Sequence, residues 1–148
     1  MGKRWGEQIG RQSLNITADT NVLIRAVMRD NPAQARLAVK ALLEAEKIAI
    51  TLPTLCEFVW VLMRTYDFKP QDVSAAIQAL TSAANVQVNR PAVEAGLAML
   101  QAGGDFADGV IAFEGRWLGG DTFVSFDRQA VALLKSQGLQ TTLLGSTD

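Results

Sequence analysis

The chain has 148 residues, of which 49% are hydrophobic, and a formal net charge of −1. This length is enough for one well-filled core and too short for two ordinary domains. We therefore expect a flexible lead-in at residues 1–13 and a single domain at residues 14–146. The near-zero charge excludes the strong positive field of an autonomous DNA-binding protein.

The sequence contains no histidine and a single cysteine, Cys56. The lack of histidine excludes Ser-His-Asp and Cys-His catalysis and the usual zinc sites. One cysteine excludes an internal disulfide and agrees with a reducing compartment. No apolar run approaches the roughly 18 residues of a membrane span, and residues 1–13 lack the apolar centre of a signal peptide, so a cytoplasmic protein is expected.

Hydrophobic periodicity predicts short strands that alternate with helices. Strands are expected at residues 14–18, 47–52, 86–88, 122–126 and 139–144, and helices at 22–28, 33–47, 53–66, 69–85, 90–101, 105–118 and 129–137. This order is typical of an α/β fold whose central, mainly parallel sheet is covered by helices on both faces. With five predicted strands, a five-stranded sheet follows.

Carboxylates recur at comparable places in this pattern. They are Asp19 at the end of the first strand, Glu57 in the helix after the second, Asp108 in the helix after Gly103-Gly104, and Asp127 at the end of the fourth strand. Each also has a local explanation. Thr54 and Glu57 fit a capping box, Asp105 and Asp127 fit helix N-caps, and Asp19 fits a turn.

The shared location of the four acids favours a metal site. In a parallel α/β sheet, the strand ends and the helix starts that follow them lie along one edge, where ligands bind. Gathered carboxylates repel one another unless a cation neutralises them. Such oxygen ligands suit Mg²⁺ or Mn²⁺, which can position a phosphodiester and activate water without histidine. The residues thus indicate a metal-dependent hydrolase of phosphate esters.

Four segments resemble the motifs of PIN-domain ribonucleases, in particular VapC-type toxins of bacterial toxin–antitoxin pairs. The segments are Asp19-Thr20-Asn21 after an apolar strand, Pro53-Thr54-Leu55-Cys56-Glu57-Phe58, the run from Asp105 to Ala112, and Ser125-Phe126-Asp127. The resemblance covers about residues 15–144. Gly109 stands where the pattern usually has alanine, which should loosen that helix by up to about 1 kcal/mol, and Ser125 replaces the commoner threonine.

The resemblance implies a PIN-like fold and Mg²⁺- or Mn²⁺-dependent cleavage of RNA. By this likeness Asp19 and Asp108 are the principal metal ligands, Glu57 and Asp127 complete an acidic quartet, and Asn21 and Ser125 hold these acids by hydrogen bonds. Asp105 is a possible contact of metal-bound water. The likeness also implies a homodimer inhibited by a small antitoxin, which would supply the DNA-binding part, and no membrane partner.

Four arginines and two tryptophans are candidates for RNA contact. Arg25, Arg29, Arg116 and Arg128 are near the expected rim, although a solvated surface role is favoured for each alone. Trp60 and Trp117 have apolar neighbours at helical spacing, which favours packing in the core or in a dimer over base stacking.

Three other classes of protein are alternatives. A receiver domain expects paired acids after strand one, an acid after strand three and a lysine after strand five, and this chain has none of these features. A haloacid-dehalogenase-type phosphatase expects an acid where Asn21 stands. A PIN-like module that only binds a partner stays open, although the intact quartet argues against it.

Overall fold

The computed structural model describes residues 14–145, so the lead-in predicted at residues 1–13 lies outside the described residues. The chain forms two compact units, Met1–Val88 and Asn89–Asp148. Over both units, the described residues form seven helices and five strands, and every strand pairing is parallel.

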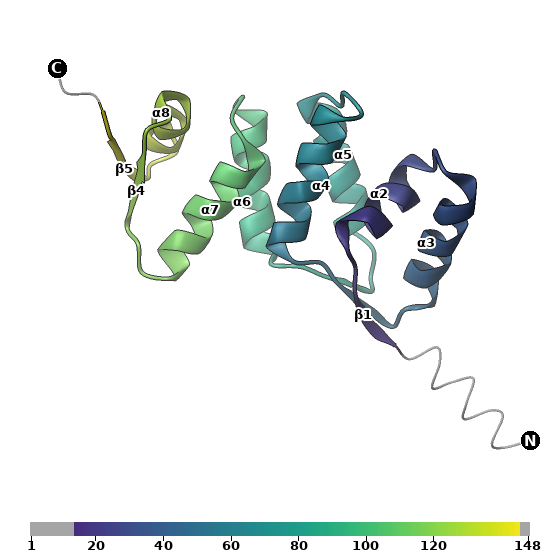
Figure 1. Cartoon of the computed structure of the whole chain (residues 1–148). Coiled ribbons are helices and arrows are strands. Elements are labelled where there is room, and N and C mark those ends of the chain that lie inside the picture. Colours follow the sequence, from purple (N-terminus) through teal and green to yellow (C-terminus); the bar gives the residue numbers. More distant parts are fainter. Residues whose placement is uncertain (1–13, 146–148) are drawn as a thin grey trace, which may run out of the picture. The chain divides into compact units, whose positions relative to one another are not determined.

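The first unit contains a parallel sheet of three strands in the order β1-β2-β3. Its elements are β1 (Asn15–Thr17), α2 (Thr20–Met28), α3 (Pro32–Glu44), β2 (Lys47–Ala49), α4 (Leu52–Arg64), α5 (Pro70–Thr81) and β3 (Val86–Gln87). Ile16, Ile48 and Val86 lie side by side across the three strands. In Figure 1, β1 leads directly into α2, and α2 lies beside α3.

The second unit contains a parallel pair of strands. Its elements are α6 (Arg90–Gln101), α7 (Phe106–Trp117), β4 (Thr122–Ser125), α8 (Arg128–Ser136) and β5 (Gln140–Leu143). Phe123 of β4 is paired with Thr141 of β5. Met99, Ala112 and Leu134 form a buried apolar cluster in this unit, which ties α6, α7 and α8 together.

All four prolines stand in the first turn of a helix. Pro32, Pro53, Pro70 and Pro91 are at the first or second position of α3, α4, α5 and α6. Proline suits this place because its fixed φ is already helical and its missing N–H would have no partner there. The side chains of Asn31, Thr51 and Asn89 cap three of these helices. These helix starts are therefore encoded locally.

Helices α6 and α7 meet at two glycines. A Cβ on Gly96 would lie 2.6 Å from the Phe106 ring, and a Cβ on Gly109 would collide with the carbonyl oxygen of Ala95. The sequence predicted only that Gly109 loosens its helix. The structure gives it a packing role instead, because the backbones of the two helices approach too closely for any side chain there.

The predicted fold class is confirmed at the level of parallel strands combined with helices. The element boundaries differ mostly by one to three residues, and α6 has the predicted limits of 90–101. The strands occupy two sheets of three and two strands, so a single five-stranded sheet is not shown. Among the described helices, none has the length and apolarity needed to span a membrane.

Candidate functional site

Asp19 lies just beyond the end of β1 and is the N-cap of α2. Its φ and ψ of −80° and 159° are extended, and its Oδ1 accepts a hydrogen bond of 2.7 Å from the Thr20 backbone N–H. The Asp19 side chain is exposed, whereas Ala18 before it is buried. The strand thus delivers a carboxylate to the surface at the point where the helix begins, and the helix dipole favours negative charge there.

Thr20 connects Asp19 with Glu57. The Thr20 hydroxyl donates a 2.9 Å hydrogen bond to Glu57 Oε1, 37 residues away along the chain, while the Thr20 amide donates to Asp19. Thr20 is 8% exposed, so its hydroxyl has little freedom to turn elsewhere. One oxygen of each carboxylate is therefore engaged by the same residue, and the Asp19–Glu57 pair is held in place.

The capping-box explanation of Glu57 is wrong. The N-cap of α4 is Thr51, whose hydroxyl accepts a hydrogen bond from the Thr54 backbone N–H. Because α4 begins at Leu52, Glu57 lies beyond the first turn, where it cannot reach the N-cap backbone. Its bond to Thr20 is a tertiary contact.

Asn21 occupies the second position of α2 and is exposed. It lines a hollow between α2 and α3 together with Val22, Arg25 and Leu37. Asn21 is therefore two residues after Asp19 in the chain, but none of the described residues that line this hollow is acidic. Its predicted role in holding an acid stays a prediction.

In the second unit, Asp105, Asp108 and Asp127 form a cluster of like charges. Asp105 is the N-cap of α7 and accepts a 3.2 Å hydrogen bond from the Ala107 N–H, as the local pattern predicted. Asp108 is in the first turn of the same helix and is half-buried. Burial raises the pKa of the Asp108 carboxyl above its ordinary value, and the negative charges of Asp105 and Asp127 raise it further.

Asp127 follows β4 as Asp19 follows β1, and it is the N-cap of α8. Its Oδ1 accepts hydrogen bonds of 3.0 and 3.1 Å from the backbone N–H groups of Gln129 and Ala130. Ser125 accepts a 3.0 Å bond from the Asp127 backbone N–H, so it fixes the backbone of that residue rather than its carboxylate. Gln129 also donates to the Gly103 carbonyl, which ties the start of α8 to the loop before α7.

The predicted site residues thus fall into two sets, the Asp19–Glu57 pair of the first unit and the Asp105–Asp108–Asp127 cluster of the second. Among residues 14–145, no group of three or more acidic or cysteine side chains is arranged to hold a metal ion by itself. The donor chemistry nonetheless fits a hard divalent cation, because every candidate ligand is a carboxylate. The sequence predicted no role for Thr20. Its role in holding Glu57 follows from a hydrogen bond between residues 37 positions apart.

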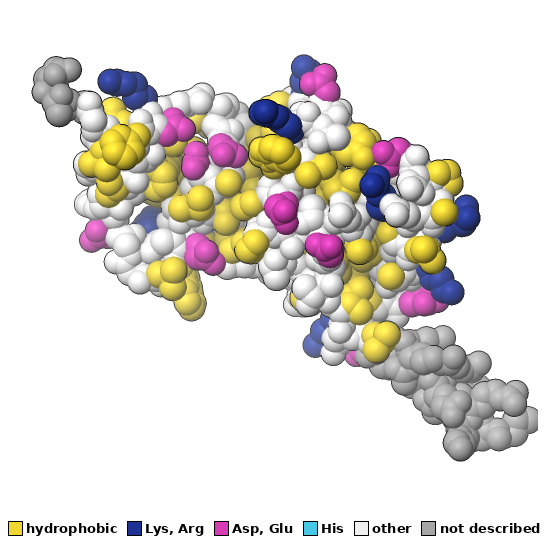
Figure 2. Space-filling model, viewed as in Figure 1, with side chains coloured by type: hydrophobic (Ala, Val, Ile, Leu, Met, Phe, Trp, Pro, Cys, Tyr) yellow, Lys and Arg dark blue, Asp and Glu magenta, His cyan; other side chains and the backbone are white. Residues whose placement is uncertain are grey.

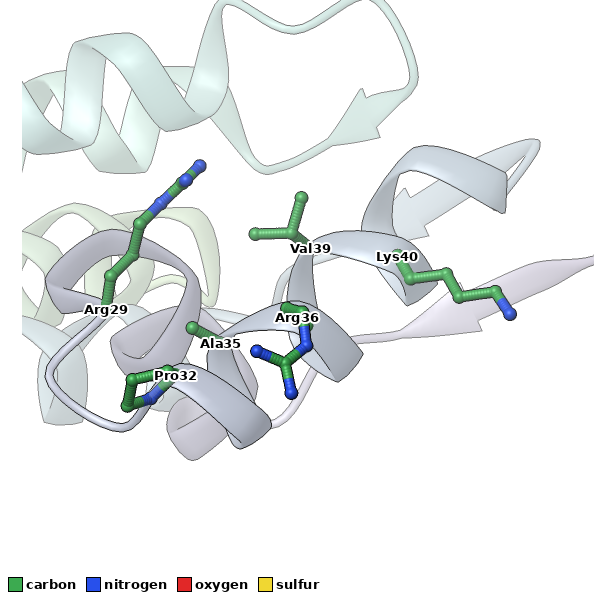
Figure 3. Close-up of a pocket in the computed structure, with 6 residues that line it drawn as sticks. All are labelled: Arg29, Pro32, Ala35, Arg36, Val39 and Lys40. Carbon is green, nitrogen blue, oxygen red and sulfur yellow. The ribbon is translucent and has the colours of Figure 1, made fainter.

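A basic hollow of about 550 Å³ lies along α2 and α3 in the first unit. Pro32, Ala35 and Val39 give it an apolar lining, and Arg29, Arg36 and Lys40 are the cations around it. Figure 3 shows that these three charged ends do not converge, since Arg29 and Arg36 point away from each other. The hollow is therefore no preformed site for a single anion. Arg25, in contrast, pairs with Asp30 at 3.2 Å.

Trp60 and Trp117 lie at the surface. Trp60 is 60% exposed and Trp117 is 80% exposed, so, of the two predicted alternatives of packing in the core or in a dimer, packing in the core is wrong for both. Figure 2 shows other hydrophobic side chains at the surface of both units, interspersed with charged ones. Packing of a tryptophan in a dimer stays a prediction.

Comparison with known families supports the motif assignment. The family described as PIN domain matches residues 16–133, which include Asp19, Glu57, Asp108 and Asp127. No curated protein matches the chain. PIN domains are generally metal-dependent nucleases, and their usual ions are Mg²⁺ and Mn²⁺. Because the match spans most of the sequence, the chain belongs to the PIN domain family.

Proposed function

We propose that this protein is an Mg²⁺- or Mn²⁺-dependent endoribonuclease in which Asp19, Glu57, Asp108 and Asp127 act together at one site. Asp19 and Asp108 would be the direct metal ligands, and Glu57 and Asp127 would hold metal-bound water. Asp105 stays a possible additional contact. A continuous five-stranded sheet, which would bring the strand ends of both units to one edge, is part of this proposal.

The observation that carries the proposal is the repeated placement of an acid after a parallel strand. Asp19 follows β1 and caps α2, and Asp127 follows β4 and caps α8. In both cases the carboxylate is fixed by backbone N–H groups at a helix start. Ligand sites of open parallel sheets form at this end of the strands, so each unit presents acids at its ligand-binding edge.

The electrostatics of Asp108 support a cation at this site. Like charges and burial disfavour its ionised form, which is an unfavourable arrangement for a purely structural residue. A divalent cation reverses this effect because it stabilises the carboxylate. Asp19 and Asp108 would hold an Mg²⁺ or Mn²⁺ ion, whose charge would activate a water for attack on the phosphodiester and stabilise the leaving oxygen. Thr20 would keep the Glu57 carboxylate oriented toward that water.

Single-atom substitutions test the proposal without disturbing the helix starts. In Asp19→Asn, asparagine caps a helix about as well as aspartate, so the fold should persist. We expect Asp19→Asn and Asp108→Asn each to reduce cleavage of a single-stranded RNA by at least about 100-fold, as expected when a ligand or a key electrostatic group is lost. Removal of divalent ions with EDTA should stop cleavage, and Mg²⁺ or Mn²⁺ should restore it.

Asp67→Asn and Asp121→Asn are matched controls in the two units. Asp67 has a positive φ of 59°, which asparagine tolerates, and an asparagine at 121 keeps an acceptor for the Thr122 hydroxyl. Both controls should cleave RNA at the wild-type rate. Wild-type protein that leaves RNA intact with either metal would reject the enzyme and favour a PIN-like binding module.

We further propose that the ribonuclease is the toxin of a toxin–antitoxin pair, works as a cytoplasmic homodimer and is inhibited by a small antitoxin that contributes the DNA-binding part. The near-neutral charge of the chain supports this division of roles. Production of the protein alone should arrest bacterial growth, and Asp19→Asn should abolish the arrest. Growth at the normal rate with active, soluble enzyme would reject the toxin role while leaving the nuclease intact.

A further inference from the structure

The exposed face of α4 carries an acid, an aromatic ring and a cation in sequence. Glu57, Trp60 and Arg64 are all exposed. Their spacing of three and four residues places them within a sector of roughly 60° on one side of the helix. Along the axis, Trp60 is about 4.5 Å and Arg64 about 10 Å beyond Glu57.

The Trp60 ring is held by Arg64. The guanidinium carbon of Arg64 lies 5.7 Å from the ring centroid, within the range of a cation–π interaction. This contact limits rotation of an exposed ring and places a positive charge beside it. The arrangement is therefore partly preordered, which reduces the entropy lost when a planar group stacks on the indole.

We propose that Trp60 and Arg64 form a platform that binds the RNA strand next to the site, with a base stacked on Trp60 and a phosphate near Arg64. This inference rests on the proposed function. If Glu57 holds the attacking water, the reacting phosphodiester lies near the Glu57 carboxylate, and a nucleotide on one side of it is within reach of the next turns of α4. Trp60 and Arg64 are the exposed side chains that follow Glu57 on that face.

The charges favour RNA over a second copy of the chain as the occupant. The cores of protein interfaces are depleted in glutamate, whereas the exposed Glu57 lies one turn from Trp60 on the same face of α4. A protein partner centred on Trp60 would also cover the approach to Glu57. Single-stranded nucleic acid is recognised by this combination of an aromatic face with a basic group.

The test measures binding of a short fluorescein-labelled single-stranded RNA in the Asp19→Asn background, where the RNA is not cut. We expect Trp60→Phe to bind within about threefold of the parent, because the ring is retained, and Trp60→Leu to bind roughly tenfold more weakly. In the active protein, Trp60→Leu should raise KM for the same RNA with kcat almost unchanged. Trp117→Leu, which changes an exposed tryptophan of the second unit, is the matched control and should alter neither value.

Four results would overturn the platform. Equal affinity of Trp60→Leu and Trp60→Phe would show that no base stacks on the ring. A change in oligomeric state of Trp60→Leu in sedimentation experiments would assign this face to a second copy of the chain. Wild-type protein that neither binds nor cuts RNA would reject the platform together with the proposed function, whereas active Trp60→Leu with normal KM would reject the platform alone.

Discussion

Replacement of Gly109 by alanine tests whether close packing of α6 and α7 positions Asp108. Gly109 follows Asp108 in α7, and its Cβ would collide with the Ala95 carbonyl oxygen and lie 2.9 Å from the Gly96 Cα. These are backbone atoms, so the contact cannot be relieved by a side-chain rotation. Accommodation requires α7 to move away from α6, which would displace the Asp108 carboxylate with it.

Two opposing terms set the expected magnitude. Alanine improves helix propensity by about 1 kcal/mol relative to glycine, while overpacking against a rigid neighbour costs about 1–3 kcal/mol. We therefore expect Gly109→Ala to lower the free energy of unfolding by up to about 2 kcal/mol. Gly115 is in the same helix, and a Cβ there has no atom within 4 Å. Gly115→Ala should thus stabilise the protein by about 0.5–1 kcal/mol.

Urea unfolding followed by circular dichroism gives the two free energies, and the RNA cleavage rate reports the position of Asp108. Gly109→Ala should lose both stability and activity, while Gly115→Ala should gain stability at unchanged activity. If the two variants were stabilised equally, the inferred close approach of α6 and α7 at Gly109 would be refuted.

Substitutions at three positions probe Asp108, the residue that orients Glu57, and a helix start. Because folding raises the pKa of Asp108, this carboxyl contributes to the free energy of unfolding. The contribution is complete below the ordinary pKa of 3.8 and is lost as pH rises through the folded-state pKa. In metal-free protein, Asp108→Asn should therefore be more stable than wild type at pH 7, with a smaller difference near pH 4; urea titrations at both pH values check this, and an equal difference would contradict it. Thr20→Val should reduce cleavage by about 10- to 100-fold through misorientation of Glu57, whereas Thr20→Ser, which keeps the hydroxyl, should stay near wild type; equal loss in both would assign the effect to packing. Thr51→Ala should cost about 1 kcal/mol in urea unfolding because α4 loses its cap, and a cost near zero would show that the Thr51 hydroxyl contributes little.

Local sequence signals were sufficient to predict where most helices and strands occur. Apolar periodicity and N-cap residues such as Asp105 and Asp127 are local signals, and the structure contains the elements they predict. The sequence also identified the candidate acids, because each of them follows a predicted strand or lies near the start of a predicted helix. The motifs led to the PIN domain family, which the family match confirms.

The contacts of several of these residues depend on the folded chain and could not be predicted from local patterns. The partner of Glu57 is Thr20, 37 residues away, although the local pattern also fitted a capping box. Gly109 is required by the backbone of another helix, and Trp60 lies at the surface despite its apolar neighbours. The pKa of Asp108 depends on burial and on Asp127, which belongs to a different helix start. These contacts join residues that are far apart in the sequence. Periodicity and spacing cannot predict them, because such patterns depend only on residues that are close together along the chain.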